Sequence, residues 1–116
     1  MERTEKPWGY EIIWAKTDKY VGKIIYIKEG HRLSRQYHES KEETIIVIEG
    51  GIILELGYGG DEDLISISLR EGMSEHIPPG FVHRFCASLG SDAKIIEVST
   101  PELDDVVRLE DDYNRD

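Results

Sequence analysis

Side chains able to hold a metal ion are concentrated between Gly30 and Gly50, in the stretch GHRLSRQYHESKEETIIVIEG. Alternate side chains of an extended strand share a face, so Gln36 and His38 should point the same way, about 7 Å apart at a rise of ~3.3 Å per residue. The four residues ESKE then turn the chain, and Glu43 opens the next strand, where it can face the same interior. This spacing predicts a chelating cluster.

A further ligand is expected from the stretch GMSEHIPPGFVHRF. Its rigid Pro-Pro-Gly turn fixes the chain ahead of Phe81, and His83 follows two residues later in the next strand. Mixed nitrogen and oxygen ligands suit Zn, Mn, Co, Ni or Fe and leave coordination positions open for water or substrate. The predicted ligand set for one divalent ion is Gln36, His38, Glu43 and His83.

The segments that must position these side chains are short, rich in Ile, Val and Tyr, and separated by Gly and Pro. No segment before residue 100 keeps a helical period for three turns. Regularly spaced short strands predict a β-sandwich or barrel, with a hairpin loop at Gly57–Asp63 and a tight turn at Glu49–Gly51. We expect strands near residues 10–14, 20–28, 32–38, 43–49, 51–58, 64–69, 74–77, 82–87 and 93–98.

The strands TIIVI and GIILEL are apolar on both faces. One face should fill the barrel, and the other should be covered by a second sheet or a partner subunit, which predicts a homodimer. Trp8, Tyr10 and Trp14 are interpreted as packing anchors of an N-terminal strand. Cys86, within the apolar run FCA, is interpreted as a buried structural thiol.

A chain of 116 residues is expected to form one domain, with an N-terminal strand or arm at 1–19, a barrel at 20–100 and an acidic segment at 101–116. The formal net charge is −10, and seven acidic residues follow Pro101. The resulting negative electrostatic field repels phosphate backbones and disfavours nucleic acids as partners. Val106, Val107, Leu109 and Tyr113 predict that part of the acidic segment is ordered.

Neither a long apolar run nor a signal-peptide pattern is present, and the single cysteine cannot form an internal disulfide. These features predict a cytoplasmic protein without membrane contact.

The two ligand-bearing stretches, GHRLSRQYHESKEETIIVIEG and GMSEHIPPGFVH, resemble the two cupin motifs. The likeness implies an all-β, cupin-type double-stranded β-helix, or jelly-roll barrel. Together with KPWGYE, LSRQYH, IPPGFVHR and RLEDDYNR, they make nearly the whole chain similar to the C-terminal cupin domain of the bifunctional mannose-6-phosphate isomerase/mannose-1-phosphate guanylyltransferase enzymes. By that resemblance the four predicted ligands occupy the family's metal positions. The chain departs from the family in its HES sequence and at Arg35.

The resemblance implies interconversion of an aldose phosphate and a ketose phosphate, with one divalent metal ion as cofactor and a sugar phosphate as substrate. Lys23, His31 and Arg32 are candidates for proton transfer or phosphate contact. Arg84 matches a recurrent family residue, yet strand alternation turns it away from the face of His83, toward a neighbouring loop or subunit. Two other functions remain open: a non-catalytic cupin that binds a sugar or sugar nucleotide, and another metal cupin enzyme such as a dioxygenase.

Overall fold

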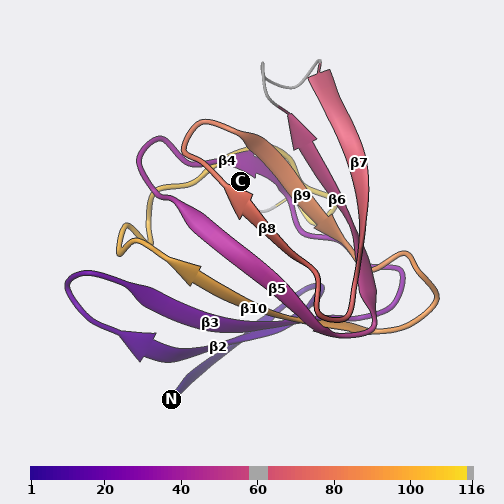
Figure 1. The fold of residues 1–116 in the computed structure, drawn as a ribbon, viewed down its shortest axis with the longest axis horizontal. Helices are drawn as coiled ribbons and strands as arrows, with labels where there is room; N and C mark the ends of the chain where they lie inside the picture. The colour runs from indigo at the N-terminus through magenta and orange to yellow at the C-terminus, as the bar shows by residue number, and fades with distance from the viewer. Residues whose placement is uncertain (58–62, 115–116) are drawn as a thin grey trace.

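The computed structural model describes residues 1–57 and 63–114, and the strands in these ranges form two antiparallel sheets that face each other (Figure 1). The first sheet runs, in spatial order, β1 (Glu2–Lys6), β2 (Gly9–Lys16), β3 (Val21–Ile27), β10 (Ala93–Ser99), β5 (Glu43–Glu49) and β8 (Ser74–Ile77). The second sheet runs β11 (Val107–Glu110), β4 (Arg35–Tyr37), β9 (Val82–Cys86), β6 (Gly51–Gly57) and β7 (Leu64–Arg70).

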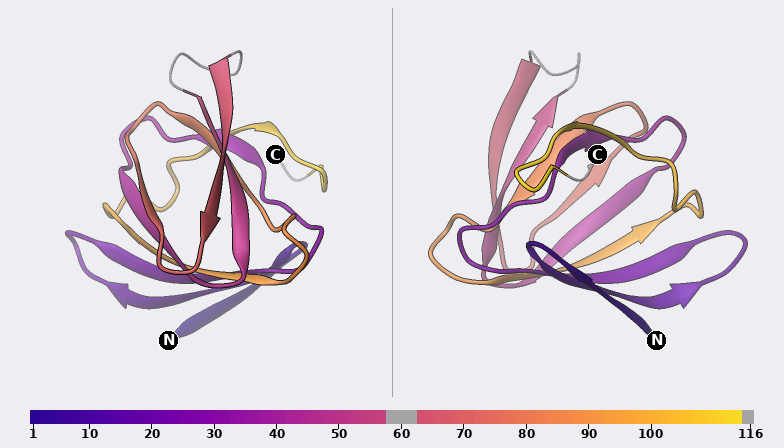
Figure 2. Two further views of the ribbon diagram at one scale, coloured as in Figure 1. Left: turned by 45° about the vertical axis from the view of Figure 1, so that its right-hand side comes forward. Right: turned by 180° about the vertical axis from the view of Figure 1, so that it is seen from behind.

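From β3 onward the chain crosses between the sheets at almost every connection, and only β6 and β7 follow each other within one sheet. This alternation winds the chain into the expected all-β double-stranded β-helix, whose two layers are seen from both sides in Figure 2. Most of the predicted hairpin loop at Gly57–Asp63 lies outside the described residues.

The core lies between the two sheets, where inward-facing positions repeat every second residue. In β5, Glu43, Ile45 and Val47 are buried, whereas the outward Ile46 and Ile48 are each 37% exposed. Other strands contribute further apolar side chains to the same core: Ile25, Ile27, Ile52, Leu54, Leu56, Phe85 and Ile95. Glu43 is therefore an acidic residue at a core position, which singles it out for chemistry.

The tight turn predicted at Glu49–Gly51 is present and joins β5 to β6. Gly50 has φ +70°, and a Cβ there would lie 2.2 Å from the carbonyl oxygen of Asp92. Both the backbone angle and the close approach exclude a larger residue. This turn moves the chain from one sheet to the other immediately after the strand that carries Glu43.

The aromatic residues near the N-terminus divide between core and surface. Trp8 is 2% exposed and belongs to the core, Tyr10 stacks on Tyr26 at a centroid distance of 4.9 Å, and Trp14 is 45% exposed. A Cβ on Gly22 would lie 2.7 Å from the Trp14 ring, so the ring rests directly on the backbone of β3. Trp8 therefore anchors the N-terminal strand in the core, as expected.

Two strands lie beyond the predicted set. β1 is almost wholly exposed and joins the sheet through backbone pairing with β2. Because it buries almost no side chains, its sequence has no alternating apolar pattern that would predict a strand. β11 lies in the acidic segment and pairs with β4, which confirms that part of this segment is ordered. The strand expected at 32–38 is shorter, with regular pairing at Arg35–Tyr37 and one isolated bridge between Arg32 and Cys86.

β9 is the one predicted strand in which every residue is buried. His83 and Phe85 face the interior, while Arg84 lies on the other face beneath the C-terminal segment. Cys86 is buried as expected, and burial raises the pKa of its thiol to about 11, with a further contribution from Glu55. Among the described residues, no helix has the length and apolar character needed to cross a membrane.

Candidate metal centre

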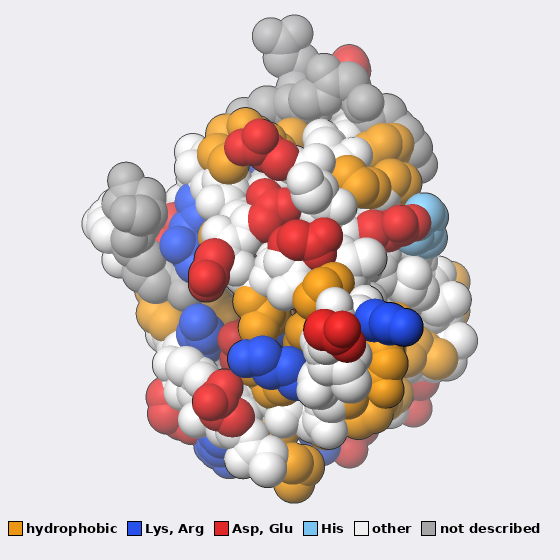
Figure 3. Space-filling view, turned by 90° about the vertical axis from the view of Figure 1, so that its left-hand side faces the viewer, with side chains coloured by type: hydrophobic (Ala, Val, Ile, Leu, Met, Phe, Trp, Pro, Cys, Tyr) orange, Lys and Arg blue, Asp and Glu red, His pale blue; other side chains and the backbone are white. Residues whose placement is uncertain are grey.

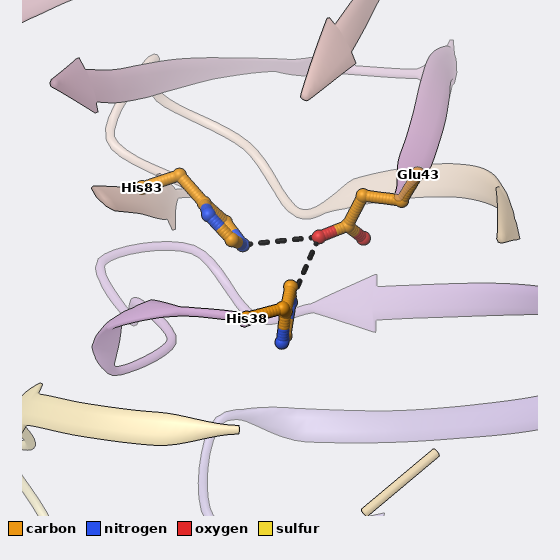
Figure 4. Close-up of side chains that lie close together, drawn as sticks. All are labelled: His38, Glu43 and His83. Carbon is orange, nitrogen blue, oxygen red and sulfur yellow. Dashed lines mark hydrogen bonds and ion pairs between the residues drawn. The ribbon is translucent and has the colours of Figure 1, made fainter. Parts of the chain in front are cut away.

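Three buried side chains from different parts of the chain converge in the interior, as Figure 4 shows. His38 directly follows β4, Glu43 is the first residue of β5, and His83 is the second residue of β9. The rigid turn before β9 is tied to His38, since the Gly80 N–H donates a hydrogen bond to the His38 carbonyl oxygen over 2.7 Å. One potential ligand atom from each of the three residues lies within 4.8 Å of the others.

Both imidazoles point Nε2 at the same carboxylate oxygen. Glu43 Oε1 lies 3.0 Å from His38 Nε2 and 3.1 Å from His83 Nε2. The second contact has ion-pair distance without hydrogen-bond geometry, so His83 Nε2 is a buried nitrogen without a hydrogen-bond partner among the described residues. The three atoms thus lie close enough together to bind one ion.

The other ring nitrogens fix this orientation. His38 Nδ1 donates to the backbone carbonyl of Asp105 over 2.5 Å, and His83 Nδ1 donates to that of Phe81 over 3.0 Å. Since a carbonyl only accepts, an imidazole that carries a single proton keeps it on Nδ1 here and presents a lone pair at Nε2. Two lone pairs then face a carboxylate, an arrangement that a divalent cation satisfies. Outer hydrogen bonds of this kind are typical of metal-binding histidines.

Asp105 holds the loop between two of these ligands. Its carboxylate accepts hydrogen bonds from the backbone N–H groups of Glu39, Ser40 and Lys41 at 2.7 to 2.9 Å. These three bonds hold the pKa of Asp105 below its usual value. One residue of the C-terminal segment therefore orients His38 through its carbonyl and the following turn through its side chain.

Two further charged groups lie behind Glu43. Burial alone would raise the pKa of Glu43, but its contacts with Glu97, His38 and His83 outweigh burial and hold that pKa well below its usual range. Burial and the neighbouring Glu43 charge raise the pKa of Glu97 well above its usual range. Lys41 Nζ lies 3.6 Å from Glu97 Oε2. Glu43 is thus kept ionised, as a metal ligand must be.

A pocket opens beside this centre. The described residues that line it include His38, Gln36, Lys23 and Glu97, with apolar walls from Trp8, Ile25, Leu33 and Phe85. Gln36 lies opposite His83 in the pairing of β4 and β9, and its Oε1 accepts a hydrogen bond from Ser34 Oγ over 2.6 Å. The pocket connects one of the histidines to solvent through mixed polar and apolar walls.

The remaining predicted site residues lie apart from the pocket lining. His31 Nδ1 is 2.7 Å from the Tyr113 hydroxyl, and Arg32 forms two hydrogen bonds with Asp112 at 2.7 and 2.9 Å. Both residues therefore contact the C-terminal segment, whereas Lys23 reaches the pocket. Arg84 faces away from His83 as the alternation of β9 predicts.

Several groups at the site were absent from the sequence prediction. For Glu97 a signal existed, since it is an acid at an inward position of the apolar strand AKIIEVS. Lys41, Asp105 and Arg108 gave no local signal, because each reaches the site through contacts distant in sequence.

Figure 3 shows the face on the left of Figure 1, where the turns from β4 to β5 and from β8 to β9 lie. Lys and Arg side chains stand beside hydrophobic side chains near the centre of this face, with acidic side chains around them. In a chain of net charge −10, this places positive charge close to the end of the barrel that holds the ligands.

The double-stranded β-helix and its histidine and carboxylate cluster define a cupin. The chain belongs to the family described as Mannose-6-phosphate isomerase C-terminal, whose model matches residues 2–111. Relatives include the xanthan biosynthesis protein XanB of Xanthomonas campestris, 34% identical over 95% of this chain, and the mannose-1-phosphate guanylyltransferase of Escherichia coli, 37% identical over 95% of it. The chain spans 23% and 22% of those two proteins.

Solved structures confirm the fold. KdgF from a Halomonas species superimposes with a TM-score of 0.75 at 20% identity, over 90% of this chain and 91% of that one. The capsular polysaccharide assembling protein CapF from Staphylococcus aureus superimposes with a TM-score of 0.83, also at 20% identity, over 94% of this chain and 34% of that one. At such identities the likeness establishes the architecture.

Proposed function

We propose that this chain is a metal-dependent sugar-phosphate isomerase, of the kind that interconverts mannose 6-phosphate and fructose 6-phosphate. The observation that carries the proposal is the convergence of two Nε2 lone pairs on one oxygen of an ionised, buried Glu43. Membership of the isomerase family supports the substrate class. His38, Glu43 and His83 would hold a divalent ion, with Gln36 as the fourth ligand.

A divalent ion bound there would polarise the substrate carbonyl and stabilise the negative charge of an enediolate. The chain's own groups then have separate tasks. The apolar walls of Trp8, Leu33 and Phe85 limit access of water to the pocket. Glu97 and Lys41 keep Glu43 oriented from behind.

The isomerisation moves a proton between C1 and C2 of the sugar, so a proton-transfer group must lie within reach of those carbons. Lys23 is our first candidate, because its side chain lines the pocket and is 12% exposed. His31 and Arg32 are weaker candidates, since each is engaged by a side chain of the C-terminal segment. Loss of turnover in Lys23→Met, but not in His31→Gln or Arg32→Met, is the expected result.

The direct test strips the protein of metal and refills it separately with Zn, Mn, Co, Ni and Fe. Formation of fructose 6-phosphate from mannose 6-phosphate should return with at least one ion. Thermal stabilisation by the sugar phosphate without any product would instead indicate a binding protein, and oxygen consumption with bound iron would indicate an oxygenase. Either of these results would replace the isomerase proposal.

We also propose that the chain forms a homodimer. A row of outward side chains crosses four strands of the first sheet in register, namely Ile12, Ile24, Ile96 and Ile46. Val98, 48% exposed, lies next to this row. A second copy of the chain would cover these residues. Light scattering of the purified protein should give twice the monomer mass. The Ile46→Lys variant should give the mass of a single chain.

A further inference from the structure

The C-terminal strand extends the row of interior side chains that contains the metal ligands. Across β11, β4 and β9, Arg108 is paired with Gln36, and Gln36 is paired with His83. Residues directly opposite one another on antiparallel strands project from the same face. Arg108 therefore faces the barrel interior, beside the predicted fourth ligand.

A break in strand register makes this possible. The pairing of β11 with β4 shifts between Arg108 and Glu110. Regular alternation would place both side chains on one face, yet Glu110 contacts Arg84 and Arg35 on the outward face of the sheet. The irregularity re-aims one side chain, as β-bulges near functional sites often do. Arg108 thereby enters the pocket while Glu110 stays outside.

One N–H group of the Arg108 guanidinium has no acceptor among the described residues. Arg108 Nε is buried and has no hydrogen-bond partner among the described residues. A buried N–H group without an acceptor is costly, and a guanidinium donates best to planar or tetrahedral oxyanions. The side chain is therefore set up to receive an acceptor that the described residues do not supply.

The acidic residues of the pocket are already engaged by other cations. Lys23 Nζ lies 3.4 Å and Lys6 Nζ 3.9 Å from the same oxygen of Glu11, and Glu97 is held by Lys41. Among the described lining residues, four are Lys or Arg and two are Glu. One carboxylate shared between two ammonium groups leaves N–H donors for another anion. The pocket carries an excess of positive charge within a strongly acidic chain.

We infer that Arg108, together with Lys6, forms a subsite for the phosphate monoester of the substrate. This inference rests on the proposed function in taking the same pocket as the substrate site, but it concerns anion binding and not turnover. The subsite makes the C-terminal strand part of the binding site and selects phosphorylated over free sugars. Arg108 supplies paired donors, and Lys6 supplies further charge.

The test is calorimetric titration of the metal-free full chain with inorganic phosphate, mannose 6-phosphate and mannose, so that no ion contributes to anion binding. Both phosphate ligands should bind, mannose 6-phosphate more tightly than inorganic phosphate, and mannose at least about tenfold more weakly than mannose 6-phosphate. Arg108→Met should weaken both phosphate ligands by about tenfold or more, and Arg108→Lys should weaken them less. The exposed Arg70→Met is the matched control and should bind like the original chain.

Thermal unfolding and metal content should show that Arg108→Met is folded with its metal site intact. If that variant does not fold, Lys6→Met tests the same subsite from β1. The inference is overturned if the unaltered chain binds no phosphate, if mannose 6-phosphate binds no better than mannose, if the folded subsite variant keeps full phosphate affinity, or if Arg70→Met loses as much. Arg108-dependent binding without formation of fructose 6-phosphate would refute the isomerase proposal and leave the subsite in place.

Discussion

Two consecutive residues of β9 lead into two different charged clusters on opposite sides of one sheet. Inward, His83 meets His38 and Glu43. Outward, Arg84 is fully buried, and its guanidinium donates to the Leu33 carbonyl at 2.9 Å, to Glu110 Oε1 at 2.7 Å and to the Glu110 carbonyl at 3.0 Å. The outward cluster is complete with protein atoms alone.

The difference distinguishes a cluster that stabilises the fold from a candidate functional site. Burial is similar on the two sides, since Arg84, His83 and Glu43 are all at most 2% exposed. In the outward cluster each donor has an acceptor, whereas in the inward cluster lone pairs converge on an ionised oxygen. Unmatched lone pairs, and not burial of charge, indicate where a ligand is required.

The largest effect is expected from neutralising the inward carboxylate. Glu43→Gln keeps the size of the side chain but removes the charge that balances a divalent ion. We expect metal content to fall from about one ion per chain to near zero and isomerase turnover to fall on the order of 10³-fold. Metal analysis and turnover check this. The matched control is Glu55→Gln, which removes a carboxylate paired with Arg35 on the outward face and should leave metal content unchanged.

Removing the outward guanidinium should reduce stability while sparing metal binding. Arg84→Met leaves the Leu33 carbonyl unpaired, but Glu110 is 49% exposed on its side chain and can be solvated. We expect the free energy of unfolding to fall by about 2–3 kcal/mol, measured by urea denaturation, with unchanged metal content. The exposed Arg3→Met is the control and should change stability little. Loss of the metal in Arg84→Met would show that the two clusters are not independent.

A smaller effect is expected on the pH dependence of stability. A hydrogen bond from Arg84 lowers the pKa of Glu110, and one from Arg32 lowers that of Asp112. A lowered folded-state pKa adds stability above the unfolded values near ~4, and this stability is lost as pH falls through the folded values. In metal-free protein, the stabilities of the original chain and Glu110→Gln should therefore converge as pH falls below ~4. A constant difference between pH 7 and pH 3 would contradict this role of Glu110.

The smallest functional effect is expected at Cys86, which lies on the outward side of β9. Its pKa of about 11 leaves roughly 100-fold less thiolate at pH 8 than the ordinary thiol pKa of 9.0 would. Alkylation by iodoacetamide should therefore be about 100-fold slower in folded than in urea-unfolded protein. Cys86→Ala should retain metal content and turnover. Rapid alkylation of the folded protein would show that the outward side of β9 opens readily.

The sequence predicted the parts of this molecule that are encoded locally. Alternation in β5 placed Glu43 inward, and the Pro-Pro-Gly turn placed His83 at the start of its strand. It did not predict β1, which has no apolar period, or the inward position of Arg108, which depends on a register shift. Asp105 lies 67 residues from His38 along the chain, and no local pattern encodes such a contact. The convergence of His38, Glu43 and His83 was thus predictable, and the groups that orient them were not.

The bond from His38 to the Asp105 carbonyl also sets an order of events during synthesis. Because a chain is made from its N-terminus, His38, Glu43 and His83 are all present before Asp105 emerges. Until then His38 lacks the acceptor that fixes its ring, and the turn after it lacks the carboxylate that holds three of its amides. A nascent chain ending before Asp105 would therefore contain every predicted ligand without the contacts that orient His38. An ion that binds at this centre would then be expected to enter late, after almost the whole barrel has been made.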